Sequence, residues 1–164
     1  SKADILKLQV RACETSLKVA KLCGLPLIIH TRAAWKETLS FIEQARLQDV
    51  KVMIHCYGGS AEELKRLRSL DVPVSYGGVP TWQKAVKVRE SFIQTPLEQL
   101  LLETDSPDLP PEIEGKKPRF NEPALLRDTA KLLAEIKKIS QEELVAAANQ
   151  NLLRYLGIEG VVLP

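Results

Sequence analysis

The sequence predicts an α/β protein whose strands form one parallel sheet. Four short apolar runs alternate along the 164 residues with longer segments in which apolar residues recur every three or four positions. The connections are short, and no β-hairpin signal such as Asn-Gly joins two apolar runs. Because this alternation is typical of strands linked by helical crossovers, we treat residues 1–164 as a single domain.

Six helices are expected, over residues 4–22, 33–47, 61–70, 82–93, 124–138 and 140–156. The first has the apolar spacing of an amphipathic helix, and Gly24 and Pro26 follow where such a helix ends. Ser60 and Glu63 have the spacing of a capping box, which predicts the start of the third helix. Gly157 is expected to end the last helix.

Four buried strands are expected, over residues 25–29, 50–54, 72–76 and 97–102. Residues 106–123 then form a long irregular segment with five prolines, and loops of this length are usually functional or disordered. This segment carries the basic cluster Lys116, Lys117 and Arg119. The cluster either steers a polyanion or is an ordinary solvated loop.

The composition is that of a globular protein with no strong charge bias. Hydrophobic residues make up 45% of the chain, and 23 basic against 21 acidic residues give a net charge of +2. The hydrophobic fraction argues against disorder, and the near balance of charge argues against long-range attraction to nucleic acid or membrane. Three cysteines without paired spacing predict buried thiols in a reducing compartment, and no apolar run is long enough to cross a bilayer. We therefore expect no membrane partner and a cytoplasmic location, with the nucleus as the alternative.

Side chains that bind metals follow three of the four apolar runs. His30 and His55, the two histidines of the chain, each come directly after a run, and Glu103 and Asp105 follow the last one. The carboxyl ends of parallel strands lie at one edge of a sheet, so these residues are expected to converge. A single histidine of this kind would more simply be a core residue, and a single aspartate a turn residue. Their occurrence at three strand ends favours a functional site.

The chemistry of this set predicts a hydrolytic metal site. Imidazole nitrogens and a carboxylate suit a zinc-like or manganese-like ion, whereas Mg²⁺ would favour the carboxylate and water. With His30, His55 and Asp105 as ligands, a coordination position remains for water, whose pKa a bound metal lowers towards neutrality. Asp105 is expected either to bind the ion or to act as the catalytic base on that water.

Several motifs resemble, in order, those of the TatD-type metal-dependent deoxyribonucleases. They are Leu-Pro-Leu-Ile-Ile-His-Thr-Arg at 25–32, Ile-His-Cys-Tyr-Gly-Gly at 54–59, Glu-Thr-Asp-Ser-Pro at 103–107, Asn-Glu-Pro at 121–123 and the segment 149–156. The resemblance implies a (β/α)8 barrel of the amidohydrolase superfamily. It also implies that His30, His55 and Asp105 bind metal and that Arg32 faces a substrate phosphate, although a solvent-exposed arginine is the competing interpretation. Glu103 and Glu122 are expected to orient a loop or a histidine.

The chain departs from this family before residue 25. Family members begin with a strand that ends in His-x-His and carry a metal-bridging glutamate in a Gly-Glu-x-Gly-Leu-Asp-like segment, and neither motif occurs here. The resemblance therefore implies the C-terminal half of a TIM-like (β/α)8 barrel, with four of eight strands and at most one weakly held ion. Two open sheet edges are expected to pair with a second copy or another partner.

The function predicted from these motifs is that of a metal-dependent phosphodiester hydrolase acting on DNA. The divalent cofactor would be Mg²⁺, Zn²⁺ or Mn²⁺. One alternative keeps the barrel and the metal but hydrolyses an ester or amide, for example on an aminoacyl nucleic acid. A second alternative is a catalytically silent binding module, since two family motifs are missing. The residues themselves do not separate these functions.

Overall fold

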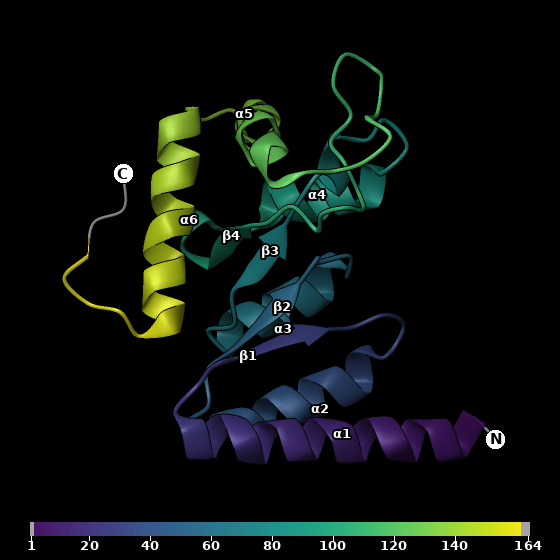
Figure 1. Cartoon of the computed structure of the whole chain (residues 1–164), viewed down its shortest axis with the longest axis vertical. Coiled ribbons are helices and arrows are strands. Elements are labelled where there is room, and N and C mark those ends of the chain that lie inside the picture. Colours follow the sequence, from purple (N-terminus) through teal and green to yellow (C-terminus); the bar gives the residue numbers. More distant parts are fainter. Residues whose placement is uncertain (1, 162–164) are drawn as a thin grey trace.

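A computed structural model describes residues 2–161 and shows the predicted alternation of strands and helices (Figure 1). The helices are α1 (Lys2–Cys23), α2 (Trp35–Arg46), α3 (Ala61–Ser69), α4 (Val86–Gln94), α5 (Leu126–Lys137) and α6 (Gln141–Leu156). The strands are β1 (Leu27–His30), β2 (Val52–His55), β3 (Val74–Tyr76) and β4 (Leu100–Leu102). Within this part of the chain, no helix is both long and apolar enough to span a membrane.

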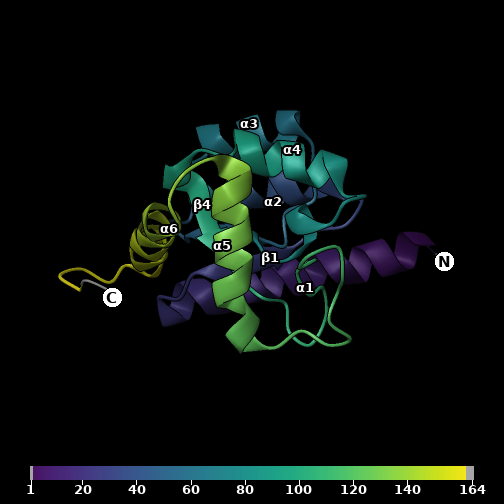
Figure 2. The same ribbon diagram turned by 90° about the horizontal axis from the view of Figure 1, so that it is seen from above.

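The four strands form one parallel sheet in the order β1-β2-β3-β4. Helix α1 lies next to β1 and α6 next to β4, so the first and last helices lie at opposite ends of the sheet (Figure 1). Helices α5 and α6 pack together and cross at a steep angle. Figure 1 shows α5 end-on and α6 from the side, and Figure 2 shows the reverse. The predicted α/β class with parallel strands is confirmed.

The two faces of the sheet differ in how their side chains are buried. Alternate strand residues join the main core between sheet and helices, whose fully buried members include Ile42, Ile54, Leu67, Val74, Phe92, Leu100 and Leu133. On the opposite face Met53 and Leu101 form a small cluster with Tyr155 of α6. Successive residues of a strand point to opposite faces. His55 therefore shares the face of Met53, and Ser75 and Glu103 share the face of Leu101.

Two predicted elements are shorter than expected because tertiary contacts override local preference. The helix predicted over residues 82–93 starts only at Val86, after a 3₁₀ turn at Val79–Thr81. Trp82 stays extended, and its indole N–H donates to the carbonyl of Pro110 at 2.8 Å. The strand predicted over residues 97–102 is confined to Leu100–Leu102, because Leu97–Gln99 forms a 3₁₀ turn.

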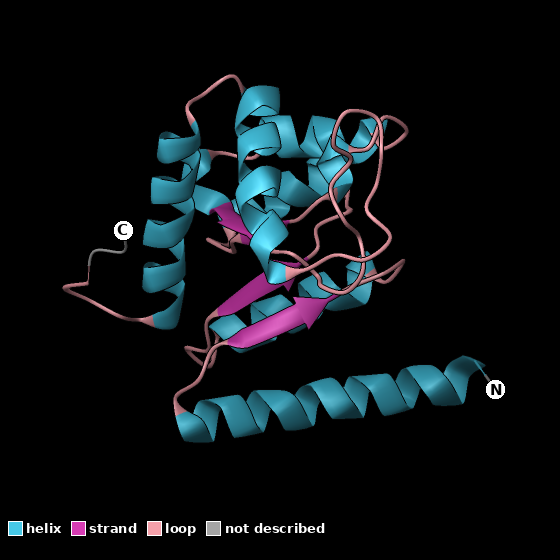
Figure 3. Cartoon of the chain, turned by 45° about the horizontal axis from the view of Figure 1, so that its top comes forward, coloured by secondary structure: helices cyan, strands magenta, loops and turns pink. Residues whose placement is uncertain are grey.

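Helix α1 is confirmed, but most of its apolar residues are not buried. Leu17 and Ala20 join the core, whereas Ile5, Leu6, Leu8 and Val10 are exposed. The reason is visible in Figure 3, in which the N-terminal half of α1 runs past the end of the sheet. The prediction of buried thiols is also wrong for Cys13 and Cys23, which are exposed, while Cys56 is half-buried.

The edge of β4 is less open than predicted. Asn151 of α6 is buried, and its side-chain amide donates to the carbonyls of Leu97 at 2.6 Å and Leu100 at 2.8 Å. The amide therefore occupies an acceptor of the edge strand that another strand would otherwise use. At the other edge, β1 pairs only with β2 among the described strands, so β1 remains the edge available for pairing.

Candidate functional site

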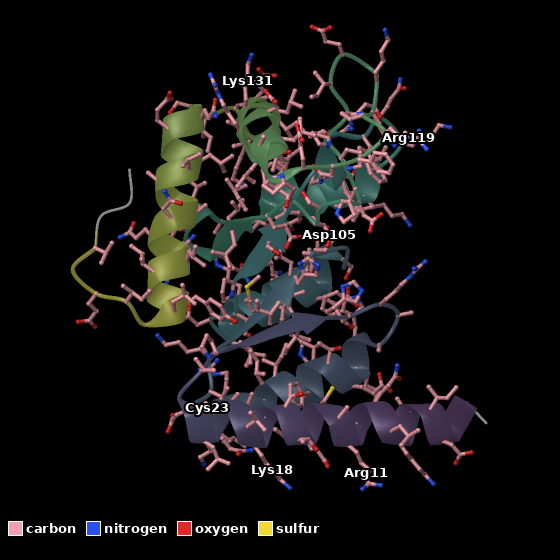
Figure 4. The ribbon with its side chains drawn as sticks, in the orientation of Figure 1. Arg11, Lys18, Cys23, Asp105, Arg119 and Lys131 are labelled. Atoms are coloured by element: carbon pink, nitrogen blue, oxygen red, sulfur yellow. The ribbon has the colours of Figure 1, made fainter. Side chains whose placement is uncertain are left out.

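The predicted site residues do meet at the carboxyl edge of the sheet. His30 and His55 end β1 and β2 and are register partners, so their rings lie side by side with centroids 5.7 Å apart. Asp105 follows β4 and lies near the ends of the central strands (Figure 4). Parallel register thus converts a separation of 25 residues into contact between two imidazoles, as the spacing of the strands predicted.

His55 lies between two carboxylates. Its Nδ1 is 2.5 Å from Oε2 of Glu103, and its Nε2 is 3.2 Å from Oδ1 of Asp105. An ionised carboxylate only accepts hydrogen bonds, so we assign the ring proton to Nδ1. Nε2 of the neutral ring then directs its lone pair at an oxygen of Asp105. Two acceptors this close repel, and either a metal cation between them or a proton on one of them would relieve the repulsion.

Glu103 is the residue that orients His55, as expected from its place in the motif. Its side chain is only 14% exposed, and Oε2 also accepts a hydrogen bond of 2.5 Å from the hydroxyl of Ser75. The second oxygen, Oε1, is buried and has no hydrogen-bond partner among residues 2–161. Glu122 behaves differently, because its side chain is exposed and its backbone N–H donates to Asn121 Oδ1 at 3.0 Å.

The loop that carries Asp105 is held in place by its own hydrogen bonds. Asp105 has a left-handed backbone with φ of 62°, a conformation that aspartate tolerates better than most residues. Its carbonyl accepts from the N–H of Asp108 at 2.9 Å. The buried amide of Asn121 donates to the carbonyls of Thr104 at 2.5 Å and Asp108 at 2.8 Å. Asn121 lies in the Asn-Glu-Pro motif, but nothing in that motif predicted these two hydrogen bonds.

Residues 106–123 form an ordered loop that docks on Trp82. Besides the bond to Pro110, the Trp82 ring is covered by the ammonium of Lys117, 3.6 Å from its centroid. Arg119 lies over the exposed ring of Phe120 and extends from the loop (Figure 4). The same segment holds four acidic residues, Asp108, Glu112, Glu114 and Glu122, against the three basic ones. Its net charge therefore does not favour attraction of a polyanion.

Two further side chains border the site. Arg32, predicted to bind substrate, is exposed in the loop between β1 and α2, two residues beyond the exposed His30. Cys56 follows His55 directly, and burial, with added repulsion from Glu103 and Asp105, raises the pKa of its thiol to about 12. A raised thiol pKa lowers the thiolate fraction at neutral pH and so makes Cys56 a poor nucleophile.

The donors on this chain fit a cation only in part. His55 Nε2 and Asp105 Oδ1 are spaced as two neighbouring acceptors that one positive ion can satisfy. However, no three histidine, cysteine, aspartate or glutamate side chains within residues 2–161 are grouped to hold a metal ion. His30 lies beside His55 without completing such a group. Of the three expected ligands, His55 and Asp105 are thus in contact, and His30 lies beside His55.

Comparisons with known proteins agree on one family and on partial coverage. The sequence profile described as TatD related DNase matches residues 2–157. The chain is 32% identical over 144 residues to the uncharacterized metal-dependent hydrolase YcfH of Escherichia coli K12, covering 87% of this chain and 53% of that protein. It is 31% identical over 152 residues to YabD of Bacillus subtilis, another uncharacterized metal-dependent hydrolase, covering 92% and 58%.

Solved structures give the same result for the fold. The crystal structure of YjjV, a TatD homolog from Escherichia coli, matches with a TM-score of 0.73 and 28% identity, covering 87% of this chain and 54% of YjjV. A TatD family hydrolase from Entamoeba histolytica matches with the same TM-score and 22% identity, which supports the fold alone. The chain spans about half the length of these relatives, and its four strands correspond to about half of their TIM barrel, as predicted.

Proposed function

We propose, because this chain belongs to the family of TatD related DNases, that its strand-end residues form one side of a metal-dependent hydrolase site that cleaves phosphodiester bonds of DNA. The proposal concerns the complete site, of which the described residues hold only a part. His55 and Asp105 would bind the ion, with His30 as the third ligand from this chain. Imidazole ligands favour Zn²⁺ or Mn²⁺ over Mg²⁺.

One observation carries the proposal: the contact of 3.2 Å between His55 Nε2 and Asp105 Oδ1, with Glu103 fixing the other side of the ring. A histidine that is held at Nδ1 by a carboxylate and directs Nε2 at a second acceptor has the arrangement of a metal ligand with its outer partner. A core histidine would instead satisfy both nitrogens with protein groups. Here the group that faces Nε2 is a second carboxylate, and a cation between the two atoms would satisfy both.

The residues of this chain have separate roles in the proposed reaction. A bound divalent ion supplies a water of lowered pKa and neutralises negative charge. The Asp105 carboxylate would accept the proton of an attacking water, and Glu103, bonded to His55 Nδ1, would keep the ring from rotating away. Arg32, exposed beyond His30, is proposed to pair with a phosphate oxygen of the substrate. DNA is proposed from the family description alone, since the relatives named above are uncharacterized hydrolases.

A second function, that of a binding module without activity of its own, is favoured by two observations. The described residues supply no group of three metal ligands, and the chain spans about half the length of its relatives. A complete site would then need ligands from outside the described residues, and the outer edge of β1 is where we propose that the group carrying them pairs. The two functions differ in whether this chain cleaves DNA alone.

The test measures Zn²⁺ and Mn²⁺ binding by calorimetry and cleavage of a labelled DNA strand, with EDTA as the metal-free control. Cleavage that disappears in Asp105→Ala and His55→Ala supports the proposal, with exposed Asp128→Ala as the matched control. Unchanged turnover in Asp105→Ala would overturn it. Binding of metal without cleavage supports the module, and release of product from an ester-linked substrate but not from DNA would instead indicate an esterase.

A further inference from the structure

Ser75 is a buried polar residue in the middle of the sheet. It lies on β3 between two apolar neighbours, Val74 and Tyr76, and is only 1% exposed. Its register partner on β4 is Leu101, so the hydroxyl lies on the same face as the candidate site. A buried hydroxyl is stable only when it is hydrogen-bonded, so its partners indicate its role.

The hydrogen bonds of Ser75 connect the strand that carries His55 with the segment that carries Glu103. The hydroxyl is 2.5 Å from Glu103 Oε2 and 3.4 Å from the carbonyl of Ile54. A serine has one proton to donate, and the shorter contact to a charged acceptor takes it. The same oxygen accepts from the backbone N–H of Cys56 at 3.2 Å, and that residue directly follows His55.

We propose that Ser75 is a positioning residue, which fixes the Glu103 carboxylate so that it holds the Nδ1 proton of His55 and leaves Nε2 directed at Asp105. The oxygen that receives the Ser75 proton is the oxygen that binds His55 Nδ1. Without Ser75, Oε2 keeps a single donor, and the carboxylate is free to exchange Oε2 for the buried, unpartnered Oε1. Rotation of the carboxylate would release the histidine ring.

The importance of this role for catalysis rests on the proposed function, but its test does not. The chain has two histidines, so the ring N–H signals of ¹⁵N-labelled protein are readily assigned, and His30 serves as the internal reference. In the unaltered 164-residue chain we expect a His55 Nδ1–H signal that exchanges slowly with water. In Ser75→Ala we expect this exchange to be about tenfold faster, the factor that corresponds to one lost hydrogen bond.

Three variants make the result specific. Ser75→Thr keeps the hydroxyl and should retain the slow signal, whereas Ser75→Cys keeps the volume with a weak donor and should lose it. Ser91→Ala is the matched control, since Ser91 is also buried and its hydroxyl donates elsewhere, to the carbonyl of Gly59 at 3.0 Å. Circular dichroism identifies any variant that does not fold, and Ser75→Cys then replaces Ser75→Ala in the comparison.

The inference is overturned if His55 Nδ1–H is unprotected in the unaltered chain, or if the folded Ser75 variants exchange no faster than Ser91→Ala. Because exchange is measured without metal or DNA, a failure of cleavage would overturn the proposed function and leave the role of Ser75 intact. Conversely, cleavage with an unchanged His55 signal in Ser75→Ala would support the function and exclude this positioning role.

Discussion

Asn151→Ala should be among the most destabilising single changes in the chain. Asn151 is 3% exposed, and its amide donates two hydrogen bonds, to the carbonyls of Leu97 and Leu100. These bonds attach α6 to the edge of β4. Alanine would remove both donors at once.

The magnitude follows from the burial of the two acceptors. A buried carbonyl that loses its partner costs about 1–3 kcal/mol. Leu100 is fully buried and Leu97 only in part, so we expect the full cost at Leu100 and less at Leu97. The sum is about 2–4 kcal/mol of unfolding free energy. With a urea m-value of about 2 kcal/mol/M, the midpoint should fall by about 1–2 M.

Urea unfolding followed by far-UV circular dichroism measures this shift. Gln150→Ala, at the exposed neighbouring position of α6, is the control for the helix itself. Asn151→Asp is the informative second variant, because it keeps the shape but has no donor at neutral pH, and it should be at least as destabilised as alanine. A midpoint for Asn151→Ala that equals that of Gln150→Ala would refute the conclusion that this amide protects the β4 edge.

Two other predictions use glycine and tyrosine. Gly78→Ala should lower the free energy of unfolding by about 1–3 kcal/mol, since a Cβ there would lie 2.5 Å from the carbonyl oxygen of Leu109. The control is Gly58→Ala, whose Cβ would meet nothing within 4 Å. Equal urea midpoints for the two variants would contradict this. Burial raises the pKa of every tyrosine in the chain, Tyr57, Tyr76 and Tyr155. Unfolded tyrosine ionises near pH 10, so the folded state should lose stability as the pH rises above 10, and phenolate absorbance should appear only together with unfolding. Absorbance that rises while the circular dichroism is unchanged would contradict this.

Local sequence signals predicted the elements well where the cause is itself local. The capping box of α3 is present as expected, with the backbone N–H of Ser60 donating to Glu63 Oε2 at 2.6 Å. Gly24 and Gly157 both take the left-handed conformation that ends a helix. Where the cause is distant in sequence, prediction failed. The extended Trp82 and the short β4 depend on Pro110 and Asn151, which lie 28 and 54 positions from the residues they contact.

The site was predictable to the extent that strand register determines it. His30 and His55 follow apolar runs and become neighbours through parallel pairing. Ser75 was missed because a single serine within an apolar strand does not indicate which partner its hydroxyl has. Its polarity within Val-Ser-Tyr was the one signal that could have found it. The exposed half of α1 was missed for a different reason. Periodicity predicts an apolar face on a helix but not whether the sheet is long enough to cover it.

The support for His55 belongs entirely to this chain, and this bears on how strongly the chain binds metal. Glu103, which follows β4, and Ser75 of β3 orient the imidazole, so the ring is in position before any further ligand binds. Low metal affinity of the chain would therefore reflect too few ligands and not a poorly oriented histidine. An additional ligand placed beside this pair would bind an ion without having to reorganise His55, which is the condition under which one more ligand adds the most affinity. In the proposed function, the Ser75–Glu103–His55 connection would thus hold one metal ligand in position before the ion binds.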